Sequence, residues 1–116
     1  MSDPLGTVRS VVLAADDVGE AARFFGETLG LELQFQDGDR WAQLSAGGIS
    51  IALAGRDERP ERGVAVNVKV ADLESAVARA VEAGALLVKP ATRGEHEISA
   101  ALRAPGGPLI YLYSSL

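Results

Sequence analysis

The sequence contains VVLAADDVGEAARFF at residues 11–25 and, 55 residues later, VNVKVADLESAVARA at residues 66–80. In both copies an alternating apolar segment leads to an Asp, Asp17 or Asp72, which is followed by an aliphatic residue and then by apolar residues at helical spacing. A Gly follows each helical segment, where a left-handed backbone conformation commonly ends a helix. An internal repeat of this kind predicts that the chain is built from two copies of one strand–helix module.

The residues after each helical segment extend the repeat. Alternating apolar residues and Gly-containing turns predict three further strands after each helix. The first copy is predicted to have strands at 7–15, 31–36, 41–46 and 49–54 with a helix at 18–29, and the second to have strands at 64–70, 86–89, 97–104 and 109–114 with a helix at 72–83. We therefore expect an α/β chain of α+β type, in which two βαβββ modules form a curved mixed sheet with the helices on its outer face.

The length of 116 residues is typical of one domain, so we expect a single domain over residues 1–116. Module one spans 7–54 and module two spans 64–114. The polar segment GRDERPERG at 55–63 is the predicted linker, and we interpret its charged side chains as solvated. Neither module alone offers a large core, so the two are expected to fold together.

The composition narrows the possible functions. The chain has no Cys, which excludes a disulfide framework, a thiolate nucleophile and a Cys-based zinc site. Its net charge of −5 argues against nucleic-acid binding, which needs a basic surface, and favours cationic ligands. No apolar run approaches ~20 residues and no basic-then-apolar leader is found, so we expect a cytoplasmic protein without a membrane partner. The preference for Arg over Lys, with many Ala and Gly, favours a GC-rich bacterial source.

The two modules, the pattern VVLAADDVGEAARFFGETLGLEL and the segment APGGPLIYLY resemble the vicinal oxygen chelate superfamily, which includes glyoxalase I, extradiol dioxygenases and bleomycin-resistance proteins. In its catalytic members, four His, Glu or Gln side chains from the first and last strands of each module bind one divalent metal ion. The matching positions here are Ser10, Ala52, Ala65 and Tyr111. Ala has no donor atom, and neutral Ser and Tyr are poor ligands for such ions. The resemblance is therefore closest to the metal-free bleomycin-resistance branch, and we expect no metal, no other cofactor and no catalytic residue.

Side chains of a strand alternate between its two sides, so each strand predicts one helix-facing set and one concave set. The helix-facing set is Val11, Leu13, Leu33, Phe35, Leu44, Ile51, Leu53, Val66, Val68, Ile98, Leu102, Ile110 and Leu112. The concave set contains the candidate ligand-binding residues, which are Glu32, Trp41, Gln43, Asn67, Ser99, Arg103, Tyr111 and Tyr113. Aromatic planes combined with a few amide and charged groups suit a planar organic ligand.

The sequence therefore predicts a metal-free binding protein that sequesters an aromatic or cationic natural product, as in antibiotic resistance. The family resemblance also implies a homodimer. One alternative is a metal-dependent glyoxalase- or dioxygenase-like enzyme with relocated ligands, for which Glu32, His96 and Glu97 are the candidates. Another is an assembly or scaffold subunit without a small ligand, which an apolar and filled concave face would favour.

Overall fold

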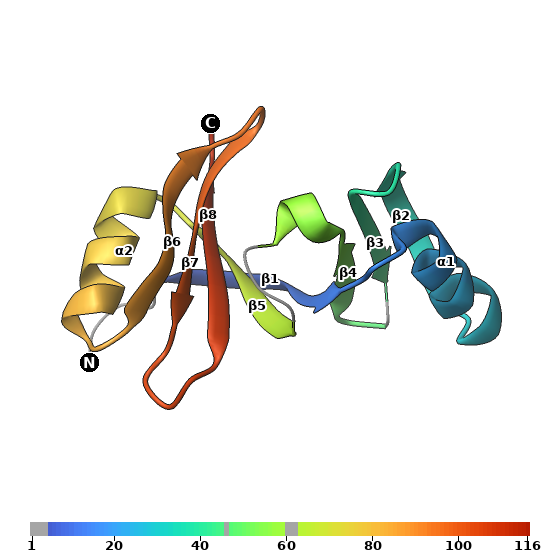
Figure 1. Cartoon of the computed structure of the whole chain (residues 1–116), viewed down its shortest axis with the longest axis horizontal. Coiled ribbons are helices and arrows are strands. Elements are labelled where there is room, and N and C mark those ends of the chain that lie inside the picture. The colour runs from blue at the N-terminus through green and yellow to red at the C-terminus, as the bar shows by residue number, and fades with distance from the viewer. Residues whose placement is uncertain (1–4, 46, 60–62) are drawn as a thin grey trace. The chain divides into compact units, whose positions relative to one another are not determined.

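The computed structural model describes residues 5–45, 47–59 and 63–116 and contains both predicted modules (Figure 1). The first comprises β1 (Gly6–Ala14), α1 (Val18–Arg23), the π-helical turn η1 (Phe24–Thr28), β2 (Glu32–Asp37), β3 (Trp41–Ser45) and β4 (Ser50–Ala54). A 3-10 helix, η2 (Arg56–Glu58), precedes the second, which comprises β5 (Val64–Val70), α2 (Leu73–Glu82), β6 (Leu86–Arg93), β7 (Glu97–Arg103) and β8 (Leu109–Ser115). The predicted α+β class with two βαβββ modules is confirmed. Among the described residues, no helix has the length and apolar character needed to cross a membrane.

Both α-helices begin at the repeated Asp residues. The carboxylate of Asp17 accepts a hydrogen bond from the backbone N–H of Glu20 at 2.8 Å, and that of Asp72 accepts one from the backbone N–H of Ser75 at 3.2 Å. These bonds satisfy N–H groups that have no partner within the helix. The first helix continues beyond α1 as the π-helical turn η1, and Gly30, with a φ of 79°, follows it in the left-handed region, as predicted.

The contacts of the chain divide it into two compact units. The N-terminal unit is Ser10–Val64, and the C-terminal unit is Ala65–Leu116 together with the beginning of the chain through Arg9. Strand β1 therefore contributes residues to both units. The single domain with module boundaries at 7–54 and 64–114 stays a prediction, and residues 60–62 of the predicted linker lie outside the described residues.

The N-terminal unit has the strand order β2-β3-β4-β1. Strands β1 and β4 pair in parallel, while β3 is antiparallel to both β2 and β4. One face of these strands is covered by α1, and the buried cluster between them consists of Ala15, Val18, Ala22, Ala42, Leu44 and Leu53. The prediction that Leu44 and Leu53 face the helix is confirmed by this cluster.

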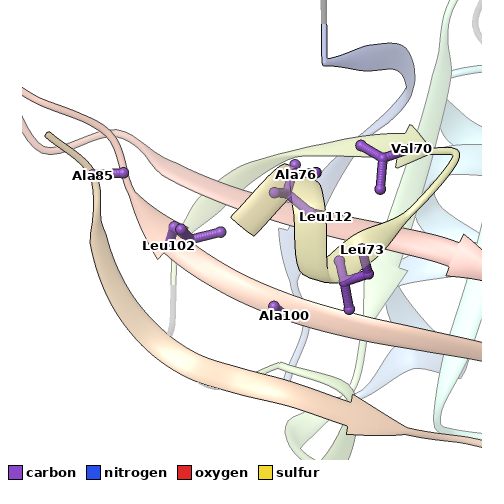
Figure 2. Packing of buried hydrophobic residues seen from close by; sticks show 7 residues of the cluster. All are labelled: Val70, Leu73, Ala76, Ala85, Ala100, Leu102 and Leu112. Atoms are coloured by element: carbon purple, nitrogen blue, oxygen red, sulfur yellow. The ribbon is translucent and has the colours of Figure 1, made fainter. Parts of the chain in front are cut away.

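The C-terminal unit has the order β5-β8-β7-β6, and the first residues of β1 lie beside β5, where Gly6 packs against the backbone of Lys69. Figure 2 shows Leu73 and Ala76 of α2 among apolar side chains of the strands. This buried cluster consists of Val70, Leu73, Ala76, Ala85, Ala100, Leu102 and Leu112. It confirms that Leu102 and Leu112 face the helix. Each unit therefore buries its own helix against one side of its own strands.

Strand β6 is longer than the predicted segment 86–89, because it continues through Pro90 to Arg93. Proline lacks a backbone N–H and normally interrupts a strand, but an edge strand has one unpaired side on which the missing donor costs little. Strand β6 stands at the end of the strand order, and its pairing with β7 is irregular at two points. The position at the edge explains why the sequence pattern ended the strand too early.

The prediction that Phe35 faces the helix is wrong. The pairing of β2 with β3 shifts between Leu33 and Phe35, so that Leu33 stands opposite Leu44 while Phe35 stands opposite Gln43. Such a bulge inserts one extra residue and turns the following side chains to the other face. Because Leu44 belongs to the core under α1 and Gln43 points to the opposite side, Phe35 lies on the side that α1 does not cover.

The interpretation of the linker charges as solvated is wrong for Arg59. Its side chain is only 5% exposed. The guanidinium donates from Nη1 to the carbonyl oxygens of Ala15 at 3.0 Å and Ala54 at 2.7 Å, and Nη2 lies 3.4 Å from Oδ1 of Asp16. Arg59 therefore joins the ends of β1 and β4 to the segment that follows them. By contrast, Glu58 forms a more exposed ion pair with Arg40 at 2.7 Å.

Candidate ligand-binding faces

The N-terminal unit has one sheet face that α1 does not cover, which we call the first helix-free face. Directly paired residues of neighbouring strands share a face, so the strand register assigns its members. They are Ser10, Val12 and Ala14 of β1, Ser50, Ala52 and Ala54 of β4, Trp41, Gln43 and Ser45 of β3, and Glu32, Phe35 and Asp37 of β2. The predicted residues Glu32, Trp41 and Gln43 therefore lie together on this face.

The first helix-free face combines small buried residues with larger, partly exposed ones. Ala52 and Ala54 are fully buried, while Trp41 and Gln43 on the neighbouring strand are half-buried. The side-chain amide of Gln43 donates from Nε2 to Oε1 of Gln34 at 3.1 Å. An indole ring and a hydrogen-bonded pair of amides thus lie beside buried methyl groups. The indole offers an apolar plane and the amides offer hydrogen-bonding groups, which are the kinds of group that a flat organic molecule contacts.

The C-terminal unit has an equivalent side that α2 does not cover, which we call the second helix-free face. Its members are Ala65, Asn67 and Lys69 of β5, Leu109, Tyr111 and Tyr113 of β8, Glu97, Ser99, Ala101 and Arg103 of β7, and Leu86, Lys89 and Thr92 of β6. The other five predicted residues, Asn67, Ser99, Arg103, Tyr111 and Tyr113, all lie on it. The structure thus places every predicted site residue on a helix-free face, three in the N-terminal unit and five in the C-terminal unit.

Tyr111 occupies the middle of the second helix-free face. Its direct partners are Asn67 on β5 and Ala101 on β7, and Ala101 is in turn paired with Lys89 on β6. Ala101 is small and buried, and the phenol ring of Tyr111 beside it is half-buried. As on the first face, an aromatic ring and an amide flank buried methyl groups.

Tyr113 lies in the adjacent row, between Lys69 on β5 and Ser99 on β7. Burial raises the pKa of Tyr113 above its ordinary value of 10.0, the positive charge of Arg9 opposes that rise, and the carboxylate of Glu97 adds to it. The guanidinium of Arg9 also donates a hydrogen bond to the phenol oxygen. At neutral pH the hydroxyl of Tyr113 is therefore protonated and can donate a hydrogen bond to a ligand while it accepts one from Arg9.

Arg103 has a structural role besides any contact with a ligand. Its Nη1 donates to the carbonyl oxygen of Gly107 at 2.7 Å, which ties the end of β7 to the turn that leads into β8. The guanidinium is held near one end of the second helix-free face, in the row of Ala65 and Leu109. Substitution of Arg103 would therefore disturb the turn as well as the face.

The positions that match the metal ligands of the family, Ser10, Ala52, Ala65 and Tyr111, lie on the helix-free faces. Ser10, Ala52 and Ala65 are buried, and Tyr111 is half-buried. Within the described residues, no three His, Asp or Glu side chains gather closely enough to hold a metal ion. The proposed relocated ligand His96 is 93% exposed in the turn before β7, with its Nε2 3.9 Å from a carboxylate oxygen of Glu95. These residues offer a divalent ion few of the donors that it prefers.

Two residues that the sequence reasoning did not single out, Phe35 and Arg9, also belong to these faces. Phe35 reaches the first face through the bulge in β2. Gln34, which the alternation also predicts on the concave side, is held beside Gln43 by a hydrogen bond. Arg9 reaches Tyr113 from the first residues of β1. No local pattern marks the bulge, and Arg9 and Tyr113 are far apart in the sequence, so only the pairing of strands brings these groups together.

The fold is similar to that of solved structures of the glyoxalase/bleomycin resistance protein/dioxygenase superfamily. A member of this superfamily from Vibrio splendidus 12B01 matches with a TM-score of 0.68 at 22% identity, over 93% of this chain and 99% of its own. Methylmalonyl-CoA epimerase from Mycobacterium tuberculosis matches with a TM-score of 0.68 at 22% identity, over 100% of this chain and 93% of its own. These two likenesses concern the fold.

The family assignment comes from the sequence comparison. The family model described as a glyoxalase-like domain matches residues 10–112, and the chain belongs to this family. An uncharacterized protein of Mycolicibacterium smegmatis is 34% identical over 110 residues, which cover 94% of both chains. The predicted resemblance to the superfamily is thus confirmed. Since the superfamily includes epimerase and dioxygenase members, membership alone does not select an activity.

Proposed function

We propose that this protein binds an aromatic organic molecule non-covalently, on its helix-free faces and without a metal ion. The observation that carries the proposal is the placement of half-buried aromatic and amide side chains beside small buried residues. Trp41 and Gln43 stand beside Ala52 on one face, and Tyr111 stands between Asn67 and Ala101 on the other. Flat rings gain stacking energy on aromatic side chains, and amides supply directional hydrogen bonds.

The residue types at the family's metal-ligand positions support binding without a metal. Two of the four are Ala, and the other two are the neutral hydroxyls of Ser10 and Tyr111. Nanomolar binding requires about 12 kcal/mol, which stacking, apolar contact and a few hydrogen bonds must then supply without coordination energy. The proposal includes sequestration of an aromatic natural product as a resistance mechanism in the bacterial cytoplasm. The relative from Mycolicibacterium smegmatis supports a bacterial setting.

The proposal also includes a homodimer. Strands β2 and β6 stand at the ends of the strand order, and Leu33 on β2 and Leu86 and Leu87 on β6 are largely exposed. Exposed apolar side chains on edge strands favour association with another chain. Sedimentation of the purified chain at micromolar concentration should give the mass of a dimer, and a monomer mass would contradict this part of the proposal.

The test of ligand binding uses Trp41, the only Trp of the chain. Aromatic antibiotics are titrated into the protein while the fluorescence of this indole is followed, and we expect saturable quenching by at least one compound class. Calorimetry then compares Trp41→Leu with Phe24→Leu, which removes an exposed ring from η1, outside both helix-free faces. We expect about 2- to 10-fold weaker binding for Trp41→Leu, the value of one aromatic contact, and unchanged binding for Phe24→Leu.

Two results would contradict the proposed function. One is equal loss of affinity in both variants, which would place the ligand elsewhere. The other is stabilisation by a divalent metal ion that a chelator reverses, measured by thermal unfolding. A metal at 100 times its dissociation constant would add about 2.7 kcal/mol and shift the transition by several degrees, which is readily detected.

A further inference from the structure

We infer that the second helix-free face selects aromatic ligands that carry an anionic group, such as a carboxylate or a phosphate. The inference rests on the proposed function and adds to it the charge of the ligand. It differs from the expectation drawn from the net charge of −5, which favours cations. The charge of the residues within reach of the bound molecule decides the preference, because salt screens charges beyond about 8–10 Å.

Positive charge is concentrated on this face. It carries Lys69 and Lys89, which are the only two lysines of the chain, and also Arg103. Arg9 adds a fourth cation through its contact with Tyr113. Among the described members of this face, the only carboxylate is that of Glu97. An acidic chain thus presents a locally basic surface.

The cations surround the tyrosines. Lys69 is the direct partner of Tyr113, whose phenol oxygen already accepts a hydrogen bond from Arg9. Lys89 stands two strands from Tyr111, with only the small Ala101 between them. Neighbouring strands are about 4.8 Å apart, so roughly 10 Å separate these two backbones. An aromatic ring that contacts the half-buried ring of Tyr111 would therefore place an anionic substituent within reach of a lysine.

The first helix-free face has the opposite charge. Within the part of the chain that the structure describes, its only charged members are Glu32 and Asp37. A uniform surface charge would have given both faces the same sign. The anion preference is thus a property of the second face and follows from the residues at its particular register positions.

The test compares three ligands with the same ring and different charge, namely 2-naphthoate, 2-naphthamide and 2-naphthylmethylammonium. Each is titrated into the 15N-labelled full chain, and dissociation constants come from shifts of backbone amides. We expect 2-naphthoate to bind most tightly and to shift the amides of β5, β7 and β8. The double variant Lys69→Gln/Lys89→Gln should weaken 2-naphthoate by roughly fivefold, the combined value of two exposed charge contacts, and leave 2-naphthamide unchanged.

Arg93→Gln is the matched control, since it removes one positive charge from the same unit. Arg93 is exposed and pairs with Ile98, which packs toward the core under α2, so it lies on the other side of the sheet. It should leave all three affinities unchanged. Tighter binding of the ammonium or the amide than of 2-naphthoate would overturn the inference and leave the proposed function intact. An equal loss of 2-naphthoate affinity in Arg93→Gln would also overturn it, and binding of none of the three would count against the proposed function itself.

Discussion

Replacement of Arg59 by Met should destabilise the fold far more than a change in a charged connecting segment ordinarily does. The guanidinium is 5% exposed and donates to the carbonyl oxygens of Ala15 and Ala54, at the ends of β1 and β4. Hydrogen bonds from a charged donor are each worth about 1.5–3 kcal/mol, but Ala54 retains a second bond from the N–H of Ala15 at 3.0 Å. We therefore expect a loss of about 2–4 kcal/mol in the free energy of unfolding. Met retains an aliphatic stem of similar volume, so the loss reports on the hydrogen bonds rather than on a cavity.

The assay is urea unfolding followed by circular dichroism, with Arg56→Met as the control. Arg56 lies three residues earlier in η2 and is exposed, so its substitution should change the free energy of unfolding by less than about 0.5 kcal/mol. Arg59→Lys should recover only part of the loss, because an ammonium does not reproduce the planar guanidinium, whose Nη1 donates to both carbonyl oxygens. A free energy of unfolding for Arg59→Met within about 0.5 kcal/mol of the parent would refute the reasoning.

Two further predictions concern the C-terminal unit. In a Tyr111→Phe background, the ultraviolet phenolate signal should show Tyr113 ionising above pH 10.0, and Glu97→Gln should lower that pKa; an unchanged pKa in Glu97→Gln would contradict the assigned cause. Because the folded state then holds a proton that the unfolded state loses, stability should fall as the pH rises above 10.0. Leu102→Ala should cost about 2–5 kcal/mol in urea unfolding because the side chain is 1% exposed in the core under α2, and a cost below about 1 kcal/mol would contradict that packing.

Much of the fold follows from patterns that are local in the sequence. Asp17 and Asp72 determine where the helices begin, because a carboxylate at that position accepts hydrogen bonds from N–H groups a few residues away. The alternation of apolar residues correctly predicts which side chains of β5, β7 and β8 face α2. The pairing of β8 with β5 and with β7 has no bulge, so the alternation continues along each strand. The repeat adds an internal check, since each element of one half predicts its equivalent in the other.

The candidate site could be predicted only in part. The alternation placed all eight predicted ligand-binding residues on the sides of the strands that the helices leave uncovered. It failed at Phe35, because one inserted residue in β2 reverses the face of the side chains that follow. The local charge of the second helix-free face could not be predicted from the sequence either. The net charge of −5 is a sum over the whole chain and does not reveal that Lys69 and Lys89 share one face.

The sequence by itself determined the two βαβββ modules, the ends of the helices and the residue types at the family's metal-ligand positions, because these depend on short-range periodicity and on the repeat. Only the tertiary structure decided that the buried guanidinium of Arg59 donates to the carbonyl oxygen of Ala15, 44 residues away, that Arg9 contacts Tyr113, and that Phe35 stands opposite Gln43. Each of these contacts joins residues through strand pairing and packing. The free energy of such contacts depends on which groups the fold brings together, and a local sequence pattern does not predict those partners.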